Sequence, residues 1–237
     1  MSSRLLNLFS STSSKRYINT SGNTEASEGP TSSKTQQNKS NSPNNSDKSP
    51  GEYGKKSPRA TAEELESKAI WKGVLDRLKI RDPTLKEIKL SNLVRISRND
   101  FYMLAILLKN NPFVRTIELT NVGLTDIDCS VLCPSFYTCR NLKHLNLEGN
   151  QIDRGIDAIS SMIATHPSLR SLNILNQNNY TPMNPNCEQK FIQAVIYNGS
   201  LLRIDYHCTS FEVTESVHYC LQRNQLMYDQ KEEQKLK

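Results

Sequence analysis

Cysteine and histidine are the residue types in this chain that are best suited to catalysis or metal binding. The six cysteines lack the paired short spacings of a zinc site. The four histidines have no serine, cysteine or acid nearby in a spacing that specifies a catalytic triad or a set of ligands. Gly123, Gly149 and Gly155 stand singly, so they form no glycine-rich phosphate loop. These residues predict a binding protein, with no enzymatic activity, no cofactor and no metal.

A repeated leucine pattern indicates the elements that would carry a binding surface. The clearest copy is Leu142-x-x-Leu145-x-Leu147-x-x-Asn150, and degenerate copies start at Leu85, Val114, Leu169 and Leu201, with successive starts 29, 28, 27 and 32 residues apart. Repeats of this length contain one short strand and one helix each. We therefore predict an α/β leucine-rich repeat solenoid, similar to ribonuclease inhibitor, with about five parallel strands and helices on the convex side.

Helical segments are expected between the strands and at both ends. Thr61-x-x-Glu64 reads as a capping box for a helix whose stripe is Leu65, Ala69, Val74, Leu75 and Leu78. After the last strand, Thr214 opens a run with Val217, Leu221 and Leu226. These two helices would cap the solenoid.

Caps and breakers are also expected within the repeats. Asn99 or Asp100 precedes one apolar stripe, and Asp153 precedes another. Pro134 falls in the middle of the expected third helix, where proline costs about 3 kcal/mol. We expect that helix to be short or broken.

Composition divides the chain into a tail, a domain and a short end. Residues 1–60 are rich in Ser, Asn and Pro and carry nine Lys and Arg against four Asp and Glu, so we expect a disordered basic tail. Residues 61–228 form the repeat domain, and 229–237 form a charged C-terminal tail. The domain is nearly neutral and shows no arginine-rich face or nucleic-acid motif. We expect a monomer that binds neither nucleic acid nor membrane.

Two surfaces of the solenoid are candidates for protein binding. One is the outward face of the strands, which carries Glu118, Asn146 and Glu148 among others. The other is the row of turns from strand to helix, with Asn92, Arg95, Asn121, Asp126, Asn150, Gln151, Asp153, Arg154, Asn176 and Gln177. An alternative for the turn residues is structural, because Asn in such turns bonds neighbouring backbone and Asp126 or Asp153 can cap a helix.

Four stretches of the chain resemble the leucine-rich domain of the tropomodulin and leiomodin family. They read DPTLKEIKLSNL at 82–93, NNPFVRTIELTNVGLTD at 110–126, NLKHLNLEGNQIDRGIDAISSMI at 141–163 and SLRSLNILNQ at 168–177. The resemblance covers residues 63–228. It implies an actin-binding domain that seats at the filament pointed end and slows subunit exchange there, in the cytoplasm and on the cytoskeleton.

The resemblance also implies where contacts with actin would lie. We expect them on the turn residues and around Arg223 in the closing helix. The amphipathic segments that precede the repeats in the family and bind tropomyosin are not found in the polar tail, so tropomyosin binding is not expected. The alternative function is a repeat adaptor that binds a protein other than actin on its concave face.

A second alternative concerns the first residues. Arg4, Lys15 and Arg16, together with apolar Leu5 to Phe9 and no acid before Glu25, resemble a weak mitochondrial presequence. A mitochondrial location is therefore the minor alternative to a cytoskeletal one.

Overall fold

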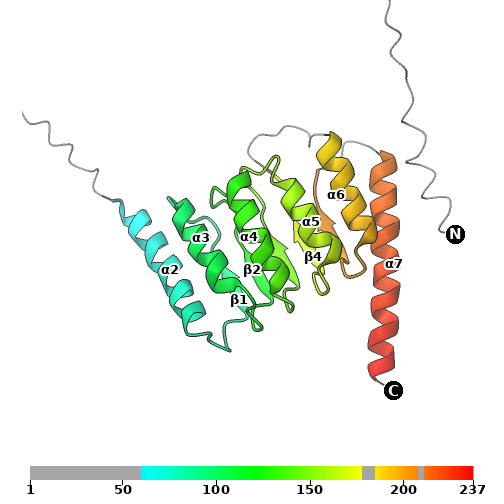
Figure 1. Cartoon of the computed structure of the whole chain (residues 1–237), viewed down its shortest axis with the longest axis horizontal. Helices are drawn as coiled ribbons and strands as arrows, with labels where there is room; N and C mark the ends of the chain where they lie inside the picture. Colours follow the sequence, from blue (N-terminus) through cyan, green and yellow to red (C-terminus); the bar gives the residue numbers. More distant parts are fainter. Residues whose placement is uncertain (1–59, 178–184, 208–210, 237) are drawn as a thin grey trace, which may run out of the picture. The chain divides into compact units, whose positions relative to one another are not determined.

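The computed structural model describes residues 60–177, 185–207 and 211–236. The predicted basic tail therefore lies outside the described residues, except for Ala60. The elements run in the order α2 (Ala62–Lys79), β1 (Glu87–Lys89), α3 (Arg98–Leu108), β2 (Thr116–Glu118), α4 (Asp126–Thr138), β3 (His144–Asn146), α5 (Ile156–Thr165), β4 (Ser171–Asn173), α6 (Pro185–Tyr197), β5 (Arg203–Asp205) and α7 (Phe211–Lys235) (Figure 1). None of the described helices is both long enough and apolar enough to cross a membrane.

The five strands form one parallel sheet in chain order, as the repeat pattern predicts. The central anchors stand side by side in register, Ile88 with Ile117, then Leu145, Leu172 and Ile204. All are buried except Ile204, which is half-buried in the last strand. Because both anchors of each strand point to the same side, the stacked strands build a continuous apolar face that no single repeat could bury.

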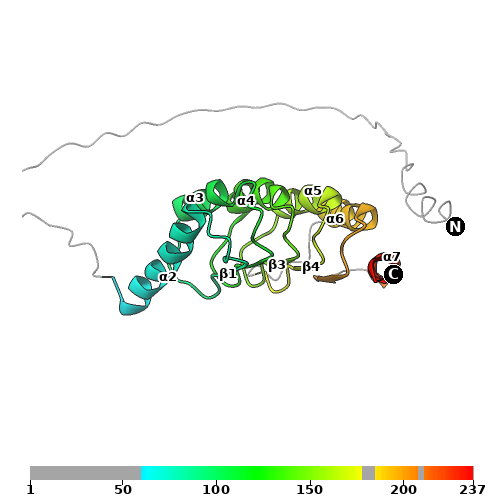
Figure 2. The same ribbon diagram turned by 90° about the horizontal axis from the view of Figure 1, so that it is seen from below.

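Helices α3 to α6 lie in a row against this apolar face, and Figure 2 shows them on one side with the strands on the other. The buried residues of each, such as Leu104 and Leu108 of α3 or Ile159 and Ile163 of α5, join the same core. Helices α2 and α7 stand at the two ends of the stack (Figure 1). The predicted helical caps are therefore confirmed.

A buried polar side chain closes three of the turns from helix to strand, those after α3, α5 and α6. Asn111 Oδ1 accepts hydrogen bonds from the N–H groups of Phe113 and Val114 at 2.8 and 3.0 Å. At the same repeat position after α5, His166 Nδ1 accepts hydrogen bonds from the N–H groups of Ser168 and Leu169 at 3.3 and 3.1 Å. Asn198 Oδ1 accepts from the next such pair, Ser200 and Leu201, at 2.8 and 2.7 Å. These buried side chains satisfy backbone donors that would otherwise be orphaned.

Pro134 does not break the third helix, so that prediction was wrong. Helix α4 runs through it to Thr138. The ring is exposed, while Leu132, Cys133 and Phe136 around it are buried. Proline removes one backbone hydrogen bond on the solvent side, and burial of the flanking side chains on the other side holds the helix together.

The end helices differ from the prediction in three ways. In α2, Leu65 is 59% exposed and Ala69 is exposed, while Trp71 is buried against Phe101 with ring centroids 5.4 Å apart. Helix α7 begins at Phe211 rather than Thr214, and its Leu226 is 64% exposed. The same helix continues to Lys235, so residues 229–235 are helical and no helix end marks the boundary at 228.

Candidate functional site

The turns that follow strands β1 to β4, at residues 91–97, 120–125, 148–155 and 175–177, line one edge of the stack, here called the loop edge. At the same position in each repeat the backbone is left-handed, with φ of 59° at Asn92, 53° at Asn121, 70° at Gly149 and 55° at Asn176. Asparagine and glycine tolerate this conformation better than other residues. The recurrence of asparagine here is therefore explained by the backbone of the turn.

Asn150 is buried and fully used inside the protein. Its Oδ1 accepts hydrogen bonds from the N–H groups of Val122 and Leu124, both at 3.1 Å. Its Nδ2 donates to the carbonyls of Leu119 at 2.7 Å and Leu147 at 2.8 Å. Because 0% of this residue is exposed, it cannot touch a partner, and its prediction as a binding residue is wrong.

Gln177 occupies the same position one repeat later, and it also bonds the backbone of its own repeat and of the preceding one. Its Oε1 accepts from the N–H of Ile152 at 3.2 Å, and its Nε2 donates to the carbonyls of Leu147 and Ile174 at 3.1 Å. At the same position the first two repeats have Leu93 and Val122, which are buried. The Gln177 side chain thus links two repeats by hydrogen bonds and is not free to bind a partner.

Several other predicted residues are held by their neighbours. Asn121 donates to Asn92 Oδ1 at 2.9 Å, and Asn176 donates to Glu148 at 2.7 Å. The Asp126 carboxylate accepts from the N–H groups of Asp153 and Gly155, both at 2.8 Å. Its role is structural, but it holds the turn of the following repeat and does not cap its own helix, whose N-cap is Thr125.

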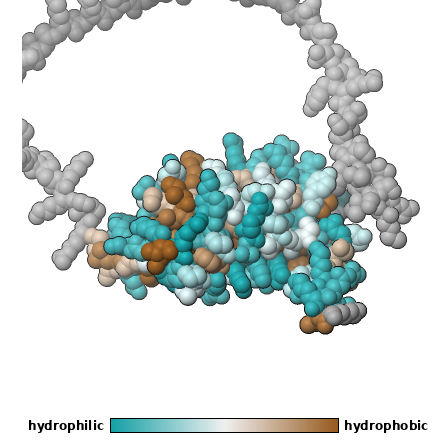
Figure 3. Space-filling view, turned by 60° about the horizontal axis from the view of Figure 1, so that its bottom comes forward, coloured by the Kyte–Doolittle hydropathy of each residue, from teal (hydrophilic) through white to brown (hydrophobic). Residues whose placement is uncertain are grey.

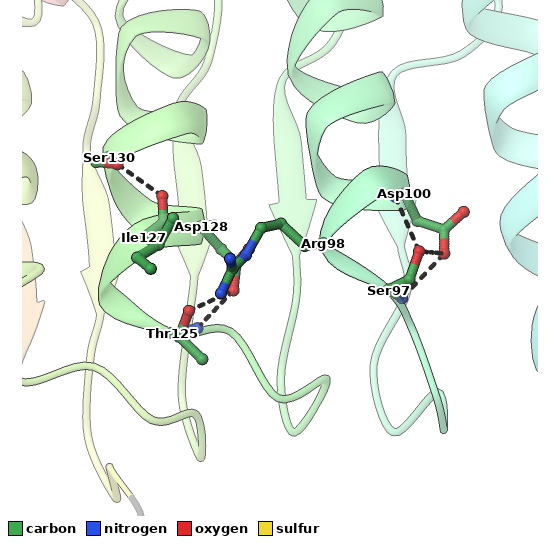
Figure 4. Close-up of polar contacts among 7 residues, drawn as sticks. All are labelled: Ser97, Arg98, Asp100, Thr125, Ile127, Asp128 and Ser130. Atoms are coloured by element: carbon green, nitrogen blue, oxygen red, sulfur yellow. Dashed lines mark hydrogen bonds and ion pairs between the residues drawn. The ribbon is translucent and has the colours of Figure 1, made fainter.

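The helix N-termini of α3 and α4 also face the loop edge, and each carries a complete capping box (Figure 4). Ser97 and Asp100 form the first, with Ser97 as the N-cap, so neither Asn99 nor Asp100 is the cap that the sequence suggested. Thr125 and Asp128 form the second, in which the Thr125 hydroxyl donates to Asp128 at 2.6 Å. Arg98 of α3 lies 4.0 Å from the same carboxylate (Figure 4).

The two predicted arginines at the ends of the stack form structural contacts. Arg95 pairs with the buried Glu64 of α2 at 2.7 Å. Arg223 donates to the carbonyls of Ile196 and Asn198, at 3.1 and 3.0 Å, where α6 ends. That is the edge where helices end, so Arg223, predicted as a contact in the closing helix, lies on the opposite edge from the loop residues.

Three predicted residues remain available. Gln151, Asp153 and Arg154 stand in the turn before α5, and their side chains form no hydrogen bond or ion pair with any described residue. Gln151 and Arg154 are exposed and Asp153 is half-exposed. Their three side chains offer an amide, a carboxylate and a guanidinium on one turn, which suits recognition of a polar protein surface.

The outward face of the sheet, here called the open sheet face, is the second candidate surface. Its charges are largely paired within a strand, Glu87 with Lys89 and Arg203 with Asp205, both at 2.9 Å. A shallow hollow of about 180 Å³ lies over its middle, bordered by Thr116, Glu118 and His144. In the part of the chain that the structure describes, no three His, Cys, Asp or Glu residues gather as a metal site would require.

Comparison with known proteins assigns the repeat domain to a family. The family described as "TMOD/LMOD Leucine-rich domain" matches residues 71–227. Human leiomodin-2 is 28% identical over 134 residues, which are 56% of this chain and 24% of leiomodin-2. Tropomodulin of Caenorhabditis elegans is 25% identical over 169 residues, which are 70% of this chain and 43% of that protein. The chain thus spans less than half the length of these relatives.

Solved structures share the fold. One described as "Leiomodin-1 Actin-Binding Site 2 (ABS2)" superposes with a TM-score of 0.66 and 24% identity, covering 70% of this chain and 96% of that one. The C-terminal domain of C. elegans tropomodulin superposes with a TM-score of 0.63 and 23% identity, covering 70% and 98%. From the match over residues 71–227, the chain belongs to the family of the tropomodulin and leiomodin leucine-rich domain.

Proposed function

We propose that this chain binds actin through its loop edge, with Gln151, Asp153 and Arg154 as the central contacts. It would act on filaments by slowing subunit exchange at the pointed end. The observation that carries this proposal is family membership over residues 71–227, in a fold that spans 96% of a leiomodin-1 domain described as an actin-binding site. Its location would be cytoplasmic, on the cytoskeleton, and its action would be binding rather than catalysis.

The choice of the loop edge follows from which side chains are still free to bond. Of the eleven residues that the sequence suggested, Asn150 is buried, and seven others bond other parts of the chain: Asn92, Arg95, Asn121, Asp126, Asn176, Gln177 and Arg223. A polar group that already has a hydrogen-bond partner in the folded chain contributes little binding free energy, because a new bond to a partner would replace an existing one.

The test is co-sedimentation of the full chain with actin filaments, together with pointed-end elongation measured while barbed ends are blocked. The loop variant replaces Gln151, Asp153 and Arg154 with alanine. The matched control replaces Thr116, Glu118 and His144 on the open sheet face with alanine. Loss of three polar contacts worth about 0.5 to 1.5 kcal/mol each should weaken binding roughly ten- to a thousandfold, whereas the control should bind like the unaltered chain.

The alternative function, an adaptor that binds another protein on the open sheet face, rests on the hollow over β2 and β3. It predicts the reverse pattern for that partner, with the open-face variant impaired and the loop variant unaffected. Absence of co-sedimentation at micromolar protein, with no slowing of elongation, would reject actin binding.

A further inference from the structure

Four basic residues form a row at the edge opposite the loop edge, where helices end and strands begin. Lys86, Arg115, Lys143 and Arg170 each stand directly before the first residue of strands β1 to β4. Backbone bonds hold them in register, since the N–H of Arg115 donates to Lys86 at 2.8 Å, that of Lys143 to Arg115 at 2.7 Å, and that of Arg170 to Lys143 at 2.8 Å. Neighbouring backbones in such a ladder are ~4.8 Å apart.

This row, here called the basic edge, is also joined by Lys231 of α7. Figure 3 brings the lower side of Figure 1 forward, and the surface there is largely hydrophilic with small apolar patches. The repeat domain is nearly neutral overall, and its net charge gives no sign of this row. Segregation by repeat position places the cations on one edge although the total charge almost cancels.

The cations of the basic edge have no acidic partner among the described residues. The Lys86 ammonium lies 4.9 Å from the centre of the Phe113 ring, and the Arg170 guanidinium lies 4.3 Å from that of Tyr228. Arg170 lowers the pKa of Lys143 by charge repulsion. Glu232, the nearby acid, pairs with Lys235 at 2.8 Å and attracts Lys143 and Arg170 only from beyond ion-pair distance. An incoming anion would therefore relieve repulsion rather than break existing pairs.

A hollow of about 180 Å³ opens between the end of this row and α7. Lys143, Arg170 and Lys231 line it with positive charge, while Pro167, Leu202 and Met227 supply an apolar wall. The mixture suits an aliphatic side chain flanked by carboxylates. It suits a nucleic acid less, because Arg170 already covers the Tyr228 ring that a base would stack on.

We propose that the basic edge binds an acidic polypeptide segment of another protein, with an apolar side chain in the hollow and flanking Asp or Glu carboxylates on Lys143, Arg170 and Lys231. The chain's own first 60 residues carry excess positive charge, so they do not fit this site. The proposal is independent of actin binding, because it uses the edge of the sheet opposite the proposed actin contacts.

The test measures binding of the full chain to a fluorescent twelve-residue peptide that carries glutamates around one central leucine. Three comparison probes are the same peptide with glutamine for every glutamate, a single-stranded oligonucleotide, and vesicles that contain anionic lipid. The test variant is Lys143→Gln with Lys231→Gln. Its matched control is Lys68→Gln with Lys72→Gln on α2, which removes the same charge from exposed positions at the other end of the stack.

The acidic peptide should bind in a salt-dependent manner, and the glutamine peptide should not. The Lys143 and Lys231 variant should weaken binding at least tenfold, while the α2 control changes it less than twofold and both variants unfold within about 2 °C of the parent. Equal weakening by the control, or equal affinity for the oligonucleotide or the vesicles, would overturn the proposal. Actin co-sedimentation should survive in the Lys143 and Lys231 variant, and its loss would overturn the assignment to a separate partner.

Discussion

The two edges of the repeat stack differ in how many of their polar side chains are already bonded within the protein. At the loop edge, Asn150 and Asp126 hold the backbone of neighbouring repeats together. At the basic edge, Lys143 and Lys231 have no ion-pair partner among the described residues. A polar residue that recurs in each repeat therefore indicates a binding surface only when its side chain has no hydrogen-bond or ion-pair partner within the folded chain.

The largest effect is expected at Asn150. Asn150→Leu keeps the branched shape of the side chain but leaves the N–H groups of Val122 and Leu124 without an acceptor, so unfolding free energy should fall by about 3 to 5 kcal/mol. Urea denaturation of the full chain measures this. Gln151→Leu, one residue away and exposed, is the control and should change stability by less than about 0.5 kcal/mol. Similar losses in both variants would contradict the division between structural and free residues.

An intermediate effect is expected at His166, a buried group at the end of α5 where the helix turns toward β4. Burial lowers the pKa of His166 below its usual 6.5, and Nδ1 already accepts two backbone hydrogen bonds. The unfolded chain then takes up a proton that the folded chain resists, so stability is lost as pH falls below 6.5. The loss contributed by this residue should reach up to about 2 kcal/mol at pH 5.

The matched variant for that prediction is His166→Asn, because Asn111 and Asn198 fill the same repeat position. Thermal unfolding between pH 5 and pH 7 should show a smaller pH dependence in the variant than in the parent. An unchanged pH profile would mean that His166 accepts a proton in the folded state.

The smallest effect, of opposite sign, is expected at Lys143. Lys143→Gln removes one charge from a row of like charges, so unfolding free energy should rise by less than about 0.5 kcal/mol at low salt and return to the parent value at high salt. Lys72→Gln on α2 serves as the control and should give no such gain. Destabilisation by Lys143→Gln at low salt would show that the basic edge is not under repulsion.

The repeat spacing predicted much of the fold because each anchor is fixed by a local rule. Leu85, Val114, Leu142, Leu169 and Leu201 are all buried where the pattern placed them. The rule fails where burial on one side outweighs local propensity, as at Pro134 within α4. It fails at Leu65 and Trp71 as well, because a helix at the end of a stack is fixed by the surface it covers.

Site residues were harder to predict than the fold. Residue type and turn position selected eleven candidates, but they could not separate Asn150 from Gln151, which are neighbours with opposite roles. A signal for the basic edge was present, since Lys86, Arg115, Lys143 and Arg170 share one repeat position. The net charge of the domain does not show this row, because acidic residues at other repeat positions cancel it.

The sequence alone determined the parallel sheet, the helices behind it and the family to which the chain is similar, because apolar periodicity and repeat length are properties of adjacent residues. Only the tertiary structure decided which polar groups remain unused, because that depends on contacts between residues some thirty positions apart. Asn150 with Leu119 and Lys143 with Arg170 become neighbours only when the repeats stack.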